Sequence, residues 1–165
     1  MLQRLDELAA DEVSFPSLPV RLAAWFHDAV YDGERDAEER SANRSEHALD
    51  GLVDPDIVAE VARLVRLTET HDPEPQDVAG CALSDADLAI LAAPTGRYAA
   101  YTEQVRREYA HVDDATFAVG RARLLRGLVA RPTFFRTAPG HDRWETPARA
   151  NLGAELARLD QAATP

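Results

Sequence analysis

The stretch "LAAWFHDAVYD", residues 22–32, places a histidine and an aspartate inside an apolar, aromatic run. Residues 18–31 are apolar on most sides, which predicts a buried central helix over this range. Burying a charge without a partner is costly, so we expect His27 and Asp28 to be hydrogen-bonded, paired or bound to a metal ion. Other helices of the chain must supply that partner.

Helical patterns continue from this stretch to the end of the chain. Residues 37–50 are polar, and Asp54-Pro55 reads as an N-cap and first-turn proline before a helix with an i, i+4, i+7 apolar stripe. Further helices are expected at 78–92, from Tyr98 to Tyr109, after Asp113-Asp114 and from about Trp144 to Leu159. No segment alternates with a period of two, so the sequence predicts an all-α bundle of six or seven helices in one compact domain, residues 1–165.

Composition narrows the class of protein. The 165 residues carry a net charge of −11, which argues against a nucleic-acid groove because such a groove needs a basic face. All 18 basic residues are arginine, which excludes lysine Schiff-base chemistry and a Walker-type phosphate loop. The single cysteine, Cys81, fits a reducing compartment. With no apolar run of ~18–20 residues and no signal pattern, we expect a cytoplasmic protein without a membrane partner.

Chemistry-capable side chains interrupt three apolar places: the pair His27-Asp28, the run Asp85-Ala86-Asp87, and His71. Neutral imidazole and carboxylate are standard ligands of divalent metals. Adjacent helical residues diverge by ~100°, so His27 and Asp28 can share an ion only in a gap where Asp87 or Asp85 adds a ligand from another helix. Asp32 follows Asp28 by one turn, which suits a carboxylate that accepts a proton or orients a water.

Structural roles compete with this interpretation. A single buried histidine is more often hydrogen-bonded in a core than bound to metal. Asp85 can cap the helix that follows it. Glu38-Glu39 can form a solvated first turn, which the helix dipole favours.

Seven blocks of the sequence occur in a recognisable order: "AAWFHDAVYD", "EERSA", "LTETH", "LSDADLAIL", "YAAYTEQVRREY", "FAVGRARLLRGLVARP" and "WETPARANLGAEL". Together they resemble the family of predicted metal-dependent HD-type phosphohydrolases, over nearly the whole chain. The resemblance implies an all-helical domain of HD type and a divalent cation, with Mn, Mg, Co, Ni, Fe and Zn all open.

The resemblance also implies roles for single residues. His27 and Asp28 match the metal-binding HD pair, and Asp87 matches the later aspartate ligand, with Asp85 as the fallback. Asp32 falls where some relatives carry an acidic residue that handles the attacking water. His71 suits a second ion or a phosphate contact.

Two further residues are implied less directly. Glu39, in the "EERSA" block, is a candidate carboxylate near the site or a catalytic base. Arg121 shares a helical stripe with Phe117 and Leu124 and is expected to point inward, where it would hold a phosphate or pair with Glu145 or Glu155. Both alternatives for Arg121 stay open.

The expected function is hydrolysis of a small phosphate ester, such as a nucleotide, by a metal-activated water. In the family an upstream histidine completes the metal site, whereas the first histidine of this chain is His27. The alternative is therefore a catalytically impaired module of HD fold that binds a ligand or another protein. A plain helical interaction protein, with His27-Asp28 hydrogen-bonded in its core, is the third reading. The expected partner is a small phosphorylated substrate, and association of identical chains is left open.

Overall fold

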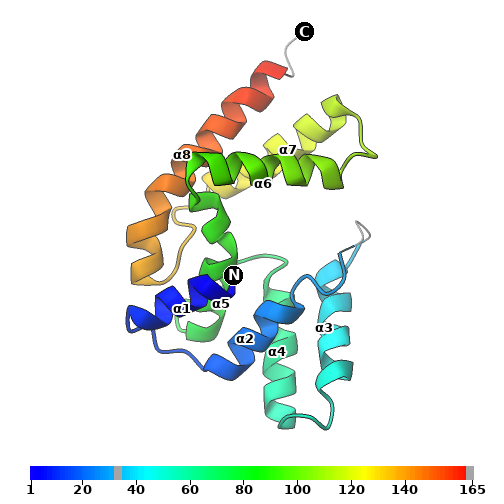
Figure 1. Cartoon of the computed structure of the whole chain (residues 1–165), viewed down its shortest axis with the longest axis vertical. Helices are drawn as coiled ribbons and strands as arrows, with labels where there is room; N and C mark the ends of the chain where they lie inside the picture. The colour runs from blue at the N-terminus through cyan, green and yellow to red at the C-terminus, as the bar shows by residue number, and fades with distance from the viewer. Residues whose placement is uncertain (32–34, 163–165) are drawn as a thin grey trace. The chain divides into compact units, whose positions relative to one another are not determined.

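The structure is a computed structural model that describes residues 1–31 and 35–162 (Figure 1). Within these ranges it contains eight α-helices, one short 3-10 helix and no strand, which confirms the all-α class. The elements are α1 Leu2–Ala10, α2 Ser17–Phe26, α3 Ala37–Leu49, α4 Pro55–Leu67, α5 Val78–Leu88, η1 Ala89–Ala92, α6 Thr95–Glu108, α7 Asp114–Val129 and α8 Ala138–Ala162.

The described helices exceed the expected six or seven because α1 was not predicted. Leu5 and Leu8 of α1 are fully buried. Their i, i+3 spacing puts both on one helical face, a pattern that was present in the sequence.

Helix α2 is shorter than the predicted range 18–31, because it ends at Phe26. The amide of Ala29 donates to the carbonyl of Phe26 at 2.9 Å, a tighter i−3 bond that closes the helix with a turn. His27 and Asp28 thus lie in the turn after the helix and not inside it. The helix is also less buried than expected, because the side chain of Trp25 is 72% exposed.

Contacts between Cα atoms divide the chain into two units, Met1–Asp87 and Leu88–Pro165. In the first unit, α3 and α4 run side by side and α2 packs against α4 (Figure 1). In the second unit, α8 packs against α7 and against η1. A single domain over residues 1–165 stays a prediction.

The start of α4 confirms its predicted cap. The side chain of Asp54 accepts a hydrogen bond from the backbone N–H of Asp56 at 2.9 Å, and Pro55 occupies the first turn. Val61, Leu64 and Val65 form the fully buried stripe of this helix. The sequence therefore places α4 well, and α4 is the helix from which the segment carrying His71 departs.

The second unit differs from its prediction at two places. Helix α8 begins at Ala138, ahead of the expected Trp144, and continues through Pro147. In α7, Leu125 is fully buried while Leu124 is 55% exposed, so the predicted inward stripe was wrong at Leu124.

Across residues 1–31 and 35–162, no single helix is long and apolar enough to cross a membrane. By length and composition only, α5 with η1 and α6 pass that test as a pair, bent by 101°.

Candidate functional site

His27 lies at the C-cap of α2, where its backbone is still helical. Its ring Nδ1 is 3.0 Å from the carbonyl oxygen of Ala24. A carbonyl only accepts, so Nδ1 carries the proton of this hydrogen bond. Nε2, on the other side of the ring, is 3.1 Å from Asp28 Oδ2 and 3.6 Å from Asp87 Oδ1.

His71 follows α4 in the connection to α5. Its backbone is left-handed, with φ +48°, and its N–H donates to the carbonyl of Leu67 at 3.0 Å. The ring Nε2 is 2.8 Å from Asp87 Oδ2. A non-glycine residue in this conformation costs about 1–3 kcal/mol, and it persists where surrounding contacts fix it.

Asp87 joins the two imidazoles. Its Oδ1 faces His27 and its Oδ2 faces His71, so residues after α2, after α4 and at the end of α5 meet within the first unit. Asp85, the fallback ligand, is fully buried. Two residues along a helix turn by ~200°, so Asp85 and Asp87 leave opposite sides of α5, and it is Asp87 that reaches the histidines.

Electrostatics favour the charged forms of His27 and Asp28. Burial lowers the pKa of His27, but the hydrogen bond with Asp28 and the negative charges of Asp87 and Asp28 outweigh burial and raise this pKa above its ordinary value of 6.5. The hydrogen bond with His27 holds the pKa of Asp28 below its ordinary value. The arrangement described is therefore a hydrogen-bonded, ion-paired cluster, which we call the His–Asp cluster: His27, Asp28, His71 and Asp87.

Two tests of metal binding give different answers. The types of donor fit a divalent ion, since imidazole nitrogen and carboxylate oxygen are its common ligands and His27 Nδ1 is already engaged by a backbone carbonyl. Among residues 1–31 and 35–162, however, no group of three or more His, Cys, Asp or Glu side chains is arranged to hold an ion. The imidazole nitrogens instead contact carboxylate oxygens directly.

The two predicted catalytic acids are placed differently. Asp32 lies outside the described residues. Glu39 pairs with Arg66 on α4, at 2.6 and 2.9 Å, and accepts a hydrogen bond from Asn43 at 3.2 Å. The hydrogen bond from Arg66 is the main cause that lowers the pKa of Glu39, which makes it a poorer base. The described contacts of Glu39 thus tie α3 to α4.

Arg121 belongs to the second unit, where it pairs with Glu155 at 2.8 Å. The two side chains are 9% and 7% exposed, and the hydroxyl of Tyr98 also donates to Glu155. Burial is the largest single influence and lowers the pKa of Arg121, but the hydrogen bond and charge of Glu155 and the interactions with Tyr101 together outweigh burial, so this pKa lies above its ordinary value. The sequence left a phosphate, Glu145 and Glu155 open as partners of Arg121, and in the structure Arg121 pairs with Glu155.

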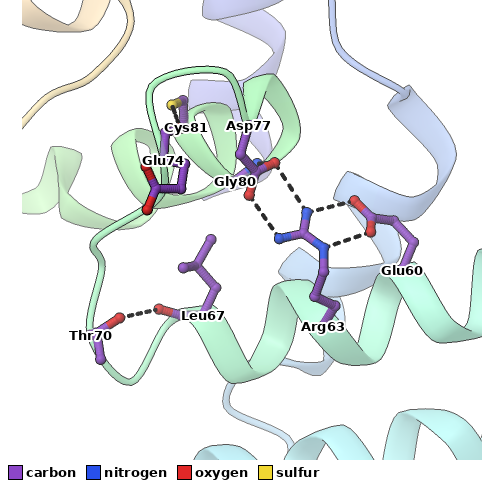
Figure 2. A network of polar contacts seen from close by, with 8 residues as sticks. All are labelled: Glu60, Arg63, Leu67, Thr70, Glu74, Asp77, Gly80 and Cys81. Atoms are coloured by element: carbon purple, nitrogen blue, oxygen red, sulfur yellow. Dashed lines mark hydrogen bonds and ion pairs between the residues drawn. The ribbon is translucent and has the colours of Figure 1, made fainter.

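A polar network missed by the sequence reasoning surrounds Arg63 in the first unit (Figure 2). Its guanidinium contacts Glu60 on its own helix and Asp77 just before α5. The i, i+3 spacing of Glu60 and Arg63 was a readable signal for the first contact. Nothing in the local pattern indicates the second.

No protein family model, curated protein or solved structure matches this chain. The resemblance to HD-type phosphohydrolases rests on the sequence blocks alone, and the function it implies is a proposal.

Proposed function

We propose that this chain is a metal-dependent phosphohydrolase of HD type that acts on a small phosphate ester, such as a nucleotide. One observation supports this best: the Nε2 atoms of His27 and His71 converge on the two carboxylate oxygens of Asp87. Three chain segments bring imidazole and carboxylate donors together there, which is the chemistry that a divalent ion needs.

In this proposal His27, Asp28 and Asp87 hold the ion, and His71 contacts phosphate or a second ion. The ion would polarise the phosphate and lower the pKa of a bound water. The carbonyl of Ala24 keeps the proton of His27 on Nδ1 and orients the ring, so Nε2 is the donor atom. Asp32 remains the proposed acid that orients the attacking water, on the strength of the resemblance.

Charge supports a small substrate. At a net charge of −11 the chain repels a long polyanion, since phosphate contacts along nucleic acid require neutralising cations. A single phosphate group bound through a metal ion does not need a basic surface. A cytoplasmic location is proposed with the same function.

The test is phosphate release from a panel of nucleotides, sugar phosphates and p-nitrophenyl phosphate with Mn²⁺, Mg²⁺, Co²⁺, Ni²⁺, Fe²⁺ or Zn²⁺. We expect turnover that requires one of these ions and that falls at least about 10-fold in Asp87→Asn and His27→Ala, the range seen when metal sites lose supporting groups. His141→Ala is the matched control, because His141 is exposed in the second unit. Absence of turnover with every ion and substrate would contradict the proposal.

A second candidate is a binding module without catalysis. It is favoured by the absence, among residues 1–31 and 35–162, of a group of side chains arranged to hold an ion. Metal titration monitored by calorimetry separates the two candidates. Saturable binding that is lost in Asp87→Asn supports the enzyme, whereas no binding of any of the six ions supports the module.

A further inference from the structure

His71 depends on other parts of the chain for its position. It lies beyond the end of α4 in a left-handed backbone conformation, and its ring reaches across to Asp87 at 2.8 Å. Two hydrogen bonds to the carbonyl of Leu67, the last residue of α4, fix the start of the segment 68–77; their donors are Thr70 Oγ1 and the His71 N–H. A second contact is needed to fix the end of the segment 68–77 that leads into α5.

Arg63 supplies that second attachment (Figure 2). Its Nη1 and Nη2 donate to the two oxygens of Asp77 at 2.7 and 3.0 Å, while Nε and Nη2 donate to Glu60 at 2.7 and 2.8 Å. Planar two-point pairing fixes direction as well as distance, which a single contact between exposed charges does not. The end of the segment 68–77 is thereby held against α4.

Asp77 also starts α5. Its Oδ1 accepts the backbone N–H of Gly80 at 2.9 Å, the hydrogen bond of a helix N-cap. Gly80 allows the first turn of α5 to approach α4 closely, because a Cβ there would lie 2.3 Å from Asp77 Oδ2 and 2.6 Å from Leu67 Cδ2. One carboxylate therefore fixes both the end of the segment and the direction in which α5 leaves.

The direction of α5 determines where Asp87 lies at the other end of the helix. Asp87 follows Asp77 by ten residues, about 15 Å along a helix, so a tilt of about 10° at the start moves the other end by roughly 2–3 Å. A displacement of that size breaks a hydrogen bond. The contact between Asp87 and His71 is thus sensitive to the contact between Asp77 and Arg63.

We propose that Arg63 and Asp77 are positioning residues that hold His71 Nε2 against Asp87 and so set the geometry of the His–Asp cluster. The consequence for metal binding rests on the proposed function. The position of the His71 ring does not rest on the proposed function, because it is a property of the chain without metal. The proposal adds Arg63 and Asp77 to the residues on which the site depends.

The primary measurement is the imidazole NMR spectrum of metal-free protein, which has five histidines. His71→Gln assigns the His71 signals by their loss. In Arg63→Met we expect these signals to shift and broaden, because the ring loses its fixed partner. Asp77→Asn should shift them in the same direction, since asparagine keeps the cap to Gly80 but lacks the charge. Arg63→Lys should shift them less than Arg63→Met.

Arg66→Met is the matched control. Arg66 lies about one turn further along α4 and makes a similar two-point pair with Glu39, but both Glu39 and its other partner, Glu46, lie on α3. We expect this variant to leave the His71 signals unchanged. The proposal is overturned if Arg63→Met and Asp77→Asn both fold, by circular dichroism, and leave the His71 signals in place, or if Arg66→Met shifts them equally.

Titration with Mn²⁺ is the second measurement. If the wild-type chain binds Mn²⁺, we expect about 10-fold weaker binding in Arg63→Met. If the wild-type chain binds none of the six ions named above, the proposed function fails, while the NMR result still decides the positioning role. Unaltered Mn²⁺ affinity in Arg63→Met would overturn that role at the metal site.

Discussion

Gly80 is the residue at which the close approach of α4 and α5 is most sensitive to one added atom. Alanine favours helix over glycine by about 1 kcal/mol. At Gly80, however, its Cβ would overlap Asp77 and Leu67. Such overpacking costs typically 1–3 kcal/mol, so we expect Gly80→Ala to lower the free energy of unfolding, measured by urea denaturation.

Gly120 provides the matched control for this prediction. It lies within α7, and a Cβ built there meets nothing within 4 Å. Gly120→Ala should therefore raise the free energy of unfolding by about 0.5–1 kcal/mol. Equal effects of the two substitutions would show that the close approach at Gly80 is unimportant.

Single residues also show where sequence reasoning stops. The sequence named Asp85 and Asp87 without a decisive reason between them, because spacing says that they face opposite ways but not which way faces the histidines. It named Glu155 as one of two partners for Arg121, and the choice depends on how α7 and α8 pack. The left-handed backbone of His71 has no signal in residue type, since glycine and asparagine are the usual occupants.

At the scale of elements, the sequence predicted helix starts best where a capping residue near the start marks them. Asp54-Pro55 and Asp113 were read as helix starts, and both aspartates accept a backbone N–H in the first turn of their helices. The end of α2 was misplaced because apolar residues continue beyond Phe26, so nothing in the pattern marks the turn. Periodicity predicts a helical face, whereas a helix end without glycine or proline depends on tertiary contacts.

The connection between α7 and α8 is held by a carboxylate of α8. Glu145 accepts the backbone N–H groups of Phe134 and Phe135 at 2.9 and 3.3 Å, the Thr133 hydroxyl at 3.1 Å and Arg149 Nε at 2.7 Å. Burial raises the pKa of Glu145, but these hydrogen bonds outweigh it and the pKa lies below its ordinary value of 4.5.

Because the pKa of Glu145 is lowered in the folded chain, the contribution of Glu145 to stability should decrease as pH falls. The stabilisation by Glu145 is fully present above the pKa of the unfolded chain, near 4.5, and is lost as pH falls through the lower pKa of the folded chain. We expect Glu145→Gln to cost about 2 kcal/mol at pH 7, from hydrogen bonds to a charged group, and progressively less as pH falls below 4.5. Urea denaturation across this range measures the difference.

Glu103→Gln is the control for Glu145→Gln. Glu103 is 72% exposed and contacts Arg107 at 3.5 Å, a surface pair expected to contribute less than about 0.5 kcal/mol. A cost for Glu145→Gln that stays constant from pH 7 to pH 3 would contradict the role given to the carboxylate charge.

At the scale of the whole molecule, two of the described polar networks each have their printed members in one unit. The Arg63 network belongs to the first unit, and the group formed by Tyr98, Arg121 and Glu155 belongs to the second. The sequence named Glu155 only as one alternative for Arg121, and it did not indicate the contacts of Arg63 with Asp77 or of Tyr98 with Glu155, whose partners lie 14 and 57 residues apart. What the sequence predicts at this scale is the class of fold, since periodicity alone excludes strands.

The placement of these two networks predicts where the effects of substitutions should appear. Glu155→Gln removes the charge opposite a buried arginine, which typically costs about 3–5 kcal/mol. We expect hydrogen exchange, measured by mass spectrometry, to accelerate in α6, α7 and α8. In Arg63→Met it should accelerate in the segment 68–77 and the first turn of α5 instead. Local exchange reports which cooperative part opens, so it separates the two effects even when overall stability also falls.

The double variant completes this test. Residues that share no partner usually act additively, within about 0.3–0.5 kcal/mol. We therefore expect the exchange pattern of Arg63→Met combined with Glu155→Gln to be the sum of the two single patterns. Accelerated exchange of the segment 68–77 in Glu155→Gln alone would contradict this prediction, because it would mean that loss of the buried pair also loosens the attachment of His71.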